Sequence, residues 1–303
     1  SQALLTVDGL AKRFGGVRAV DGVDLQVYRG ETLGLIGPNG AGKTTLFEML
    51  GGFTRPDAGT IVYGGRDITR LNPEQRADLG IIRSFQDAGL FPTLTVLETV
   101  QLAQERSAPT RTFATLAGAR KPDRVKEERA RELVSLMGLD AYVDKQTSEL
   151  STGTRRITEL TCIIALEPTL VLLDEPSSGV AQRETEALGE LLDKVKAYLD
   201  ATLVVIEHDM PLIMGMADRI VAMDSGRVIA EGTPAEVIAD PLVLESYLGG
   251  SAVAVGRSGA ARSGKADPDR CQATTRAGEP CRRTAVSGGY CTQHGAVLAS
   301  TAR

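Results

Sequence analysis

One stretch of nine residues decides the fold of this chain: Gly37-Pro38-Asn39-Gly40-Ala41-Gly42-Lys43-Thr44-Thr45. The apolar run at 32–36 predicts a buried strand before it, and residues 46–50 predict the start of a helix after it. A Gly-x4-Gly-Lys-Thr spacing between strand and helix is typical of a phosphate-binding loop, because glycines let successive N–H groups approach an anion. We therefore expect the whole stretch to bind a nucleotide, with Lys43 at the terminal phosphates and the Thr44 hydroxyl on Mg²⁺.

The composition is that of a folded chain without a membrane-spanning helix. Its 303 residues are 42% hydrophobic, which is enough for one large core or two modest domains. No run approaches the roughly 18 apolar residues that a spanning helix needs, and no N-terminal signal pattern is present. We therefore expect a soluble chain that reaches a membrane only through a partner.

Charge is unevenly distributed along the chain. The net charge is −5, but residues 251–303 hold eight Lys/Arg against three Asp/Glu, which leaves residues 1–250 at −10. The asymmetry indicates a separate basic tail, and the acidic body argues against nucleic acid as the principal ligand.

Strands and helices alternate beyond the loop. Residues 4–90 predict short strands and turns, and residues 95–165 predict mainly helix. Further along, the pattern predicts strands at 170–173, 202–206 and 219–223 and helices at 183–199 and 209–217. This alternation favours an α/β fold with a largely parallel sheet covered by helices. We expect a nucleotide-binding domain over 1–250 with a helical subdomain at about 87–165, a flexible linker over 251–268 and a small module over 269–297.

An apolar strand ends in two carboxylates in the run Val171-Leu172-Leu173-Asp174-Glu175-Pro176. The carboxyl ends of parallel strands face the ligand crevice, so we expect both carboxylates near the phosphate loop. Asp174 is placed to hold Mg²⁺ through water, and Glu175 to polarise an attacking water. Hydrolysis of this kind depends on positioning and charge neutralisation more than on covalent chemistry.

Four further motifs follow the same order as in a known family. They are Lys12-Arg13-Phe14-Gly15-Gly16, Arg83-Ser84-Phe85-Gln86, Leu150-Ser151-Thr152-Gly153-Thr154 and Val205-Ile206-Glu207-His208-Asp209. With them, residues 4–250 resemble the nucleotide-binding subunit of an ATP-binding cassette (ABC) transporter. The resemblance implies a P-loop ATPase core with an antiparallel β subdomain and a helical subdomain.

The resemblance also implies a role for each motif. Phe14 stacks on adenine, Gln86 touches Mg²⁺ and the attacking water, and His208 contacts the γ-phosphate. Taken alone, Phe14 would also fit core packing, Gln86 a polar surface position and His208 packing at the end of an apolar strand. Ser151 would likewise fit a plain helix N-cap followed by solvated arginines at 155 and 156.

The implied enzyme is an ATPase that works as a dimer of identical or different subunits. The two subunits close head to tail, so that the helix start at Ser151 and Gly153 of one caps the γ-phosphate held by Lys43 of the other. ATP and Mg²⁺ are the implied cofactors, and Glu175 is the implied base. A transmembrane permease would convert closure and opening into transport.

The chain departs from the family's pattern in two places. Thr152 and Thr154 replace the third and fifth residues of the usual Leu-Ser-Gly-Gly-Gln, which weakens the expected contact with ribose or the helix start. Ala181 stands where the family commonly has Asp or Asn, which puts tight communication between the two sites in doubt and is compatible with a heterodimer.

Five stretches resemble the ATPases of branched-chain amino-acid importers in particular. They lie at 14–20, 92–98, 206–210, 232–237 and 246–249. This branch implies uptake of branched-chain amino acids or related small polar solutes, with permease subunits, a solute-binding protein and a position on the cytoplasmic face of the cell membrane. The alternatives are the ATPase of an exporter or transporter fusion, and a non-transport ATPase whose basic tail binds nucleic acid or ribosomes.

The tail carries four potential metal ligands, Cys271, Cys281, Cys291 and His294. Three cysteines and one histidine suit tetrahedral Zn²⁺, and a segment so poor in apolar residues would need such a ligand to fold. The segment resembles small appended modules with this ligand set, although its spacing is not a common finger spacing. Redox-active thiols and a disordered tail with incidental cysteines are the alternatives. The fourth cysteine, Cys162, lies in an apolar helical stretch and is expected to pack in the core.

Overall fold

The computed structural model describes residues 2–84, 90–107, 121–180 and 182–247. The expectations for Gln86, for Ala181, for the linker at 251–268 and for the module with Cys271, Cys281, Cys291 and His294 lie outside the described residues.

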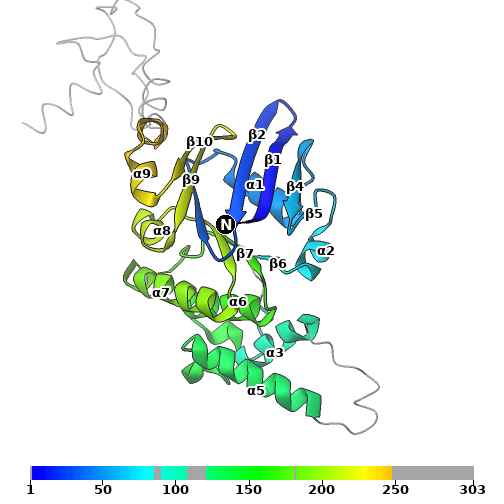
Figure 1. Ribbon diagram of the computed structural model, residues 1–303. Coiled ribbons are helices and arrows are strands. Elements are labelled where there is room, and N and C mark those ends of the chain that lie inside the picture. Colours follow the sequence, from blue (N-terminus) through cyan, green and yellow to red (C-terminus); the bar gives the residue numbers. More distant parts are fainter. Residues whose placement is uncertain (1, 85–89, 108–120, 181, 248–303) are drawn as a thin grey trace, which may run out of the picture. The chain divides into compact units, whose positions relative to one another are not determined.

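A six-stranded sheet carries the phosphate loop, with its strands in the order β10-β9-β3-β8-β7-β6 (Figure 1). Its strands are β3 Thr32–Ile36, β6 Ile81–Arg83, β7 Leu170–Asp174, β8 Thr202–Ile206, β9 Arg219–Asp224 and β10 Arg227–Gly232. All neighbouring pairs are parallel except β9 with β10. Every residue of β3, β7 and β8 is buried, which is typical of parallel strands covered on both faces. The predicted parallel sheet is confirmed, with one antiparallel strand at its edge.

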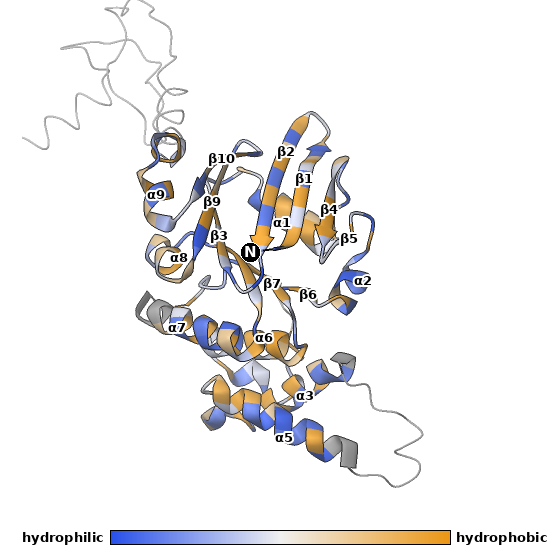
Figure 2. Cartoon of the chain, viewed as in Figure 1, coloured by the Kyte–Doolittle hydropathy of each residue, from blue (hydrophilic) through white to orange (hydrophobic). Residues whose placement is uncertain are grey.

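A second sheet is antiparallel and has four strands in the order β2-β1-β4-β5. Its strands are β1 Ala3–Phe14, β2 Val17–Tyr28, β4 Ala58–Tyr63 and β5 Arg66–Asp67. Hydrophobic and hydrophilic residues alternate along β2 (Figure 2), where Val23, Leu25 and Val27 are buried and the residues between them are exposed. The buried face packs with helix α1, Lys43–Gly51, in one apolar core.

The two faces of the six-stranded sheet pack into different cores. Leu170 and Leu172 of β7 join the core around α1, whereas Val171 and Leu173 join a second core built with helices. The helices of this second core are α3 Val96–Ser107, α5 Lys121–Leu136, α6 Thr152–Ala165, α7 Gln182–Leu199, α8 Met210–Met216 and α9 Pro234–Ala239. Two short 3₁₀ turns, η1 Asp140–Tyr142 and η2 Thr147–Glu149, lie between α5 and α6. Within the described ranges, no helix is long and apolar enough to cross a bilayer.

A buried arginine donates hydrogen bonds to carbonyl groups at the C-terminal end of helix α1. Arg76 lies on helix α2, Pro73–Asp78, and is 1% exposed. Its Nη1 donates to the carbonyl oxygens of Met49 at 2.7 Å and Leu50 at 2.6 Å, and its Nη2 donates to that of Ile68 at 2.8 Å. Met49 and Leu50 are in the last turn of α1, where carbonyls lack partners inside the helix. Burial lowers the pKa of Arg76 to about 10.

Candidate functional site

Two glycines of the phosphate loop, Gly37 and Gly42, leave no room for a side chain. Gly37 has φ 150°, and a Cβ there would lie 2.2 Å from the carbonyl oxygen of Met223 on β9. Gly42, the N-cap of α1, has φ 100°, and a Cβ there would lie 2.2 Å from the carbonyl oxygen of Ala19 on β2. The loop is therefore held between the two sheets by close backbone approaches.

Lys43 folds back over this loop. Its ammonium is buried and donates to the carbonyl oxygens of Gly37 at 2.7 Å and Pro38 at 3.0 Å. Burial lowers the pKa of Lys43, while the nearby carboxylates of Glu175 and Asp174 raise it. The loop, the lysine and both predicted carboxylates therefore belong to one site.

Asp174 ends β7 and is 1% exposed. Its Oδ2 accepts a hydrogen bond from Arg83 Nη2 at 2.9 Å, and its backbone N–H donates to Ser84 Oγ at 3.0 Å. Its Oδ1 is buried and has no hydrogen-bond partner among the described residues. A buried carboxylate oxygen without a donor is suited to a cation, so this residue fits the expected Mg²⁺.

Glu175 and His208 meet at the ends of adjacent strands. His208 Nε2 lies 3.1 Å from Glu175 Oε1, and both side chains are partly exposed. Glu175 has φ 48°, an uncommon backbone conformation for a side-chain-bearing residue, and its N–H donates to the carbonyl oxygen of Ile206 at 2.9 Å. The structure thus brings together the residues predicted as base and γ-phosphate contact.

Glu207 organises this pair, and the sequence reasoning missed it. Glu207 is 1% exposed and follows β8 directly. Its Oε1 accepts from the Ser177 N–H at 2.8 Å, and its Oε2 accepts from Ser177 Oγ at 2.9 Å, His208 N–H at 3.0 Å and Asp209 N–H at 3.3 Å. The carboxylate joins the loop after β7 to the loop after β8. Its position between an apolar strand and the predicted histidine was the only sequence signal for it.

Tyr247 is a second residue that the sequence reasoning did not assign to the site. Its phenol oxygen accepts a hydrogen bond from the Gly37 N–H at 2.9 Å, across a sequence separation of 210 residues. Burial raises the pKa of Tyr247. The end of the described chain therefore contacts the first glycine of the phosphate loop.

Phe14 and Ser151 lie apart from this cluster. Phe14 is 50% exposed with the Lys12 ammonium 5.5 Å from its ring centre, so the core-packing alternative is wrong. Ser151 is the N-cap of α6 and accepts from the Thr154 N–H at 3.2 Å, which agrees with the capping alternative. Among the described residues, no hydrogen bond joins Phe14 or Ser151 to Lys43.

Arg156 corrects one expectation. The capping alternative left it solvated, but it is 7% exposed and forms an ion pair with Glu159 at 2.9 Å. Its guanidinium also donates to the carbonyl oxygens of Asp174 at 3.2 Å and Pro176 at 3.3 Å. An arginine on α6 thus supports the backbone that carries both carboxylates.

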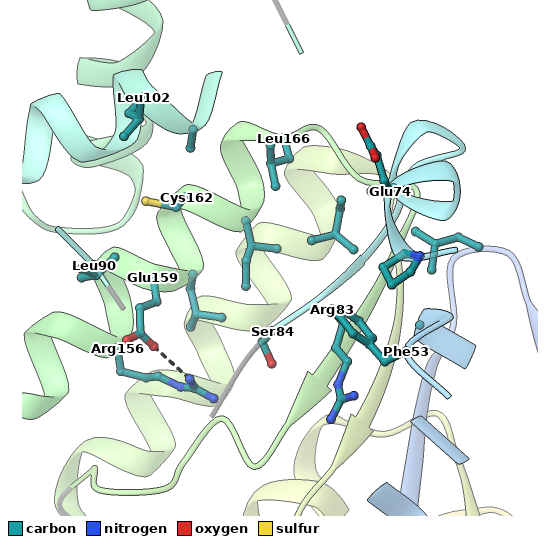
Figure 3. A pocket seen from close by; sticks show the side chains of 18 residues that line it. Phe53, Glu74, Arg83, Ser84, Leu90, Leu102, Arg156, Glu159, Cys162 and Leu166 are labelled. Atoms are coloured by element: carbon teal, nitrogen blue, oxygen red, sulfur yellow. Dashed lines mark hydrogen bonds and ion pairs between the residues drawn. The ribbon is translucent and has the colours of Figure 1, made fainter. Parts of the chain in front are cut away.

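A largely apolar groove of about 680 Å³ lies between β6, α2, α3 and α6 (Figure 3). Its lining includes Phe53, Arg83, Ser84, Leu90, Leu102, Arg156, Glu159, Cys162 and Leu166. Cys162, expected in the core, is half-buried and lines this groove while packing against the helical core on its other side. Burial and the Glu159 carboxylate raise the pKa of its thiol to about 12.

The fold and the site together define the class of protein to which this chain belongs. Phosphate-loop proteins that hydrolyse nucleoside triphosphates place this loop beside an acidic strand end, as this chain does. Residues 20–178 match the family model described as ABC transporter, and residues 227–253 match the model described as branched-chain amino acid ATP-binding cassette transporter. The chain belongs to the ABC transporter ATP-binding family, whose ATP hydrolysis is coupled to transport.

Named relatives and solved structures agree with this assignment. The high-affinity branched-chain amino acid transport ATP-binding protein LivG of Escherichia coli is 39% identical over 252 residues, 82% of this chain and 99% of the relative. BraF of Pseudomonas aeruginosa, which has the same description, is 36% identical over 252 residues, again 82% of this chain and 99% of the relative. A crystal structure of the ADP conformation of an ATP-binding cassette of an ABC transporter superposes with a TM-score of 0.71 at 29% identity, covering 82% of this chain and 100% of that one.

Proposed function

We propose that this ATPase powers the uptake of branched-chain amino acids through membrane permease subunits and a solute-binding protein. The observation that carries the proposal is the match of residues 227–253 to the branched-chain cassette model, in a segment whose Tyr247 binds the phosphate loop. The descriptions of the LivG and BraF relatives support the same cargo. The subunit works at the cytoplasmic face of the cell membrane, held there by the permease.

Within the site, we assign the chemistry to the clustered residues. Lys43 exchanges its two carbonyl partners for the terminal phosphates of ATP, which its long side chain reaches from the start of α1. Glu175 takes the proton of the attacking water, and His208 contacts the γ-phosphate while it holds the Glu175 carboxylate.

Thr44, Asp174 and Gln86 are the residues that we assign to Mg²⁺, with Gln86 outside the described residues. The unpartnered Oδ1 of Asp174 supports this assignment. When bound, the ion would neutralise charge on the phosphates.

The site is completed by a second subunit. Ser151 caps the fourteen-residue helix α6, whose first N–H groups suit an anion. We assign Ser151 and Gly153 to the γ-phosphate bound by Lys43 of the partner, and the exposed ring of Phe14 to the adenine of its own subunit.

The groove is where we expect a permease to dock, through a short amphipathic helix on its cytoplasmic side. Its apolar lining supports this choice, because amphipathic helices bind with their apolar face in such grooves. Leu102, which lines the groove and is 46% exposed, is the position to test.

Affinity capture from native membranes tests the whole proposal. Tagged Glu175→Gln protein, which should retain ATP in a closed dimer, is purified with Mg²⁺ and ATP, with Glu190→Gln on the exposed surface of α7 as the matched control. Recovery of permease subunits and a solute-binding protein would support import. A permease alone would favour export or a fusion partner, and ribosomal or nucleic-acid partners alone would overturn the proposal.

A second variant pair tests the docking groove. Leu102→Asp should abolish recovery of the permease while binding of ADP stays normal. Val125→Asp, on an α5 residue that is 65% exposed and outside this groove, should leave recovery unchanged.

The Cys/His tail remains a separate proposal. Among the described residues no group of three or more His, Cys, Asp and Glu could hold a metal ion, and the four tail ligands lie outside that part of the chain. We propose that Cys271, Cys281, Cys291 and His294 bind one Zn²⁺. Metal analysis of native protein should give about one equivalent of zinc, lost on Cys281→Ser, and substoichiometric zinc that is unaffected by this change would refute it.

A further inference from the structure

Arg83 connects the groove to the carboxylate of the site. It is the last residue of β6, and its guanidinium lies 5.6 Å from the centre of the Phe53 ring. Phe53 and Arg83 both line the groove (Figure 3). The Arg83 Nη2 lies 2.9 Å from Asp174 Oδ2, and the two side chains are only 13% and 2% exposed. One buried ion pair therefore joins the permease groove to the residue assigned to Mg²⁺.

Both members of this pair have unused hydrogen-bonding capacity. Arg83 Nε and Asp174 Oδ1 are buried, and neither has a partner among the described residues. Buried polar atoms nearly always have a partner, so the pair is incomplete on both sides. Asp174 can accept a cation, and Arg83 can donate to an added acceptor.

We propose that Arg83 competes with Mg²⁺ for Asp174. The competition changes how firmly the Arg83 side chain, which lines the groove, is held by Asp174. The inference rests on the proposed function, in which Asp174 holds Mg²⁺ and the groove receives a permease helix. A guanidinium bonded to Asp174 lies close to any divalent ion at the same carboxylate, and like charges repel strongly where water screens them poorly. Asp174 therefore loosens its bond to Arg83 when it takes the ion.

Linkage makes the coupling reciprocal. A group that binds in the groove and draws Arg83 away from Asp174 raises the affinity of the site for Mg²⁺. Bound Mg²⁺ raises the affinity of the groove for that group by the same factor. The unpartnered Nε of Arg83 gives an acceptor on the docked permease helix a place to bind. A docked permease would thus raise the affinity of the site for Mg²⁺-nucleotide through Arg83.

A Mg²⁺ titration of nucleotide binding tests the competition. Binding of a fluorescent ADP analogue, which is not hydrolysed, is followed at pH 8 as Mg²⁺ is added. In Arg83→Gln, which keeps a donor but loses the charge, the half-saturating Mg²⁺ concentration should fall by about tenfold or more. In Arg83→Lys, which keeps the charge, it should stay within about twofold of wild type.

Arg129→Gln is the matched control. Arg129 also forms an ion pair, with Glu132, and lies 5.2 Å from an aromatic ring, that of Tyr198, but on α5. Its loss should leave the Mg²⁺ dependence unchanged. An unchanged or higher half-saturating Mg²⁺ concentration in Arg83→Gln would overturn the competition.

A fluorescent reporter tests the groove side with Arg83 in place. The chain has no tryptophan, so Phe53→Trp introduces a single tryptophan beside the Arg83 guanidinium. Adding Mg²⁺ to the ADP-loaded protein should change its emission, and the change should vanish in the double variant with Arg83→Gln. Tyr198→Trp, beside Arg129, should not respond. No response at Phe53→Trp would overturn the connection to the groove.

These experiments contain no permease, so they separate the two proposals. If Leu102→Asp leaves permease capture intact while Arg83→Gln shifts the Mg²⁺ dependence, the docking site is wrong and the competition stands. If capture is lost with Leu102→Asp but Arg83→Gln shifts nothing, the docking proposal stands and the role of Arg83 is refuted.

Discussion

Glu207→Gln removes one charge from the centre of the site while keeping the shape of the side chain. The buried carboxylate accepts from two donors of Ser177 and from the N–H groups of His208 and Asp209. Glutamine can accept on one side only, because its amino group faces donors on the other. Three bonds become neutral and weaken by about 1 kcal/mol each, and one unpaired donor costs about 1–3 kcal/mol, so the free energy of unfolding should fall by about 4–6 kcal/mol.

The same variant should lose activity. His208 directly follows Glu207 and lies 3.1 Å from Glu175, so a shift of this loop separates the pair. We expect the kcat for ATP hydrolysis to fall by about tenfold or more, and urea denaturation to show the lost stability. Glu127→Gln, which affects an exposed pair with Arg131, should change stability by less than about 0.5 kcal/mol. If Glu207→Gln unfolded and hydrolysed ATP like wild type, Glu207 would not organise the site.

Three further predictions concern single side chains. Tyr247→Phe removes the acceptor for the Gly37 N–H and should weaken ADP binding by about three- to tenfold in a titration, with no change contradicting a role for this contact. Arg76→Met removes the donor to the buried Leu50 carbonyl and leaves the Met49 carbonyl only the Gly52 N–H, so it should lower the unfolding free energy by about 3–5 kcal/mol in a denaturant titration, whereas a loss below about 1 kcal/mol would argue against it. Because the pKa of Cys162 is raised from 9.0 to about 12, its thiolate should appear only at high pH. Its alkylation by iodoacetamide at pH 8, followed by mass spectrometry, should therefore be about a hundredfold or more slower than that of free cysteine, and an equal rate would contradict the raised pKa.

Local sequence patterns predicted most of the fold. The strands predicted at 32–36 and 202–206 match β3 and β8 residue for residue, because short apolar runs between turn residues are a local property. The phosphate loop and the carboxylates Asp174 and Glu175 were predictable for the same reason, since each motif is contiguous. The helix predicted at 183–199 begins one residue earlier, at Gln182, which is within the usual variation of helix ends.

The residues that connect these motifs were not predictable, because their partners are far away in sequence. Glu207 contacts Ser177 across 30 residues, and Arg83 contacts Asp174 across 91. Nothing in the local pattern around a charged residue tells whether it is solvated or buried against such a partner. Arg156 shows the difficulty, because its place near the start of α6 suggested solvent, yet tertiary packing buries it.

The close approach between Gly42 and Ala19 changes how variants of the phosphate loop should be interpreted. Gly226, in the turn between β9 and β10, reinforces the same junction, because its N–H donates to the carbonyl oxygen of Ala41 at 3.0 Å and its carbonyl oxygen accepts from the Asp21 N–H at 2.9 Å. A methyl group at position 42 would therefore push β2 away from the loop before any nucleotide arrived. Gly42→Ala thus perturbs the junction between two sheets, whereas Lys43→Ala removes a side chain and its two hydrogen bonds to the loop carbonyls without forcing a clash on either sheet. Only the second variant separates the loss of a phosphate contact from the loss of the architecture that supports it.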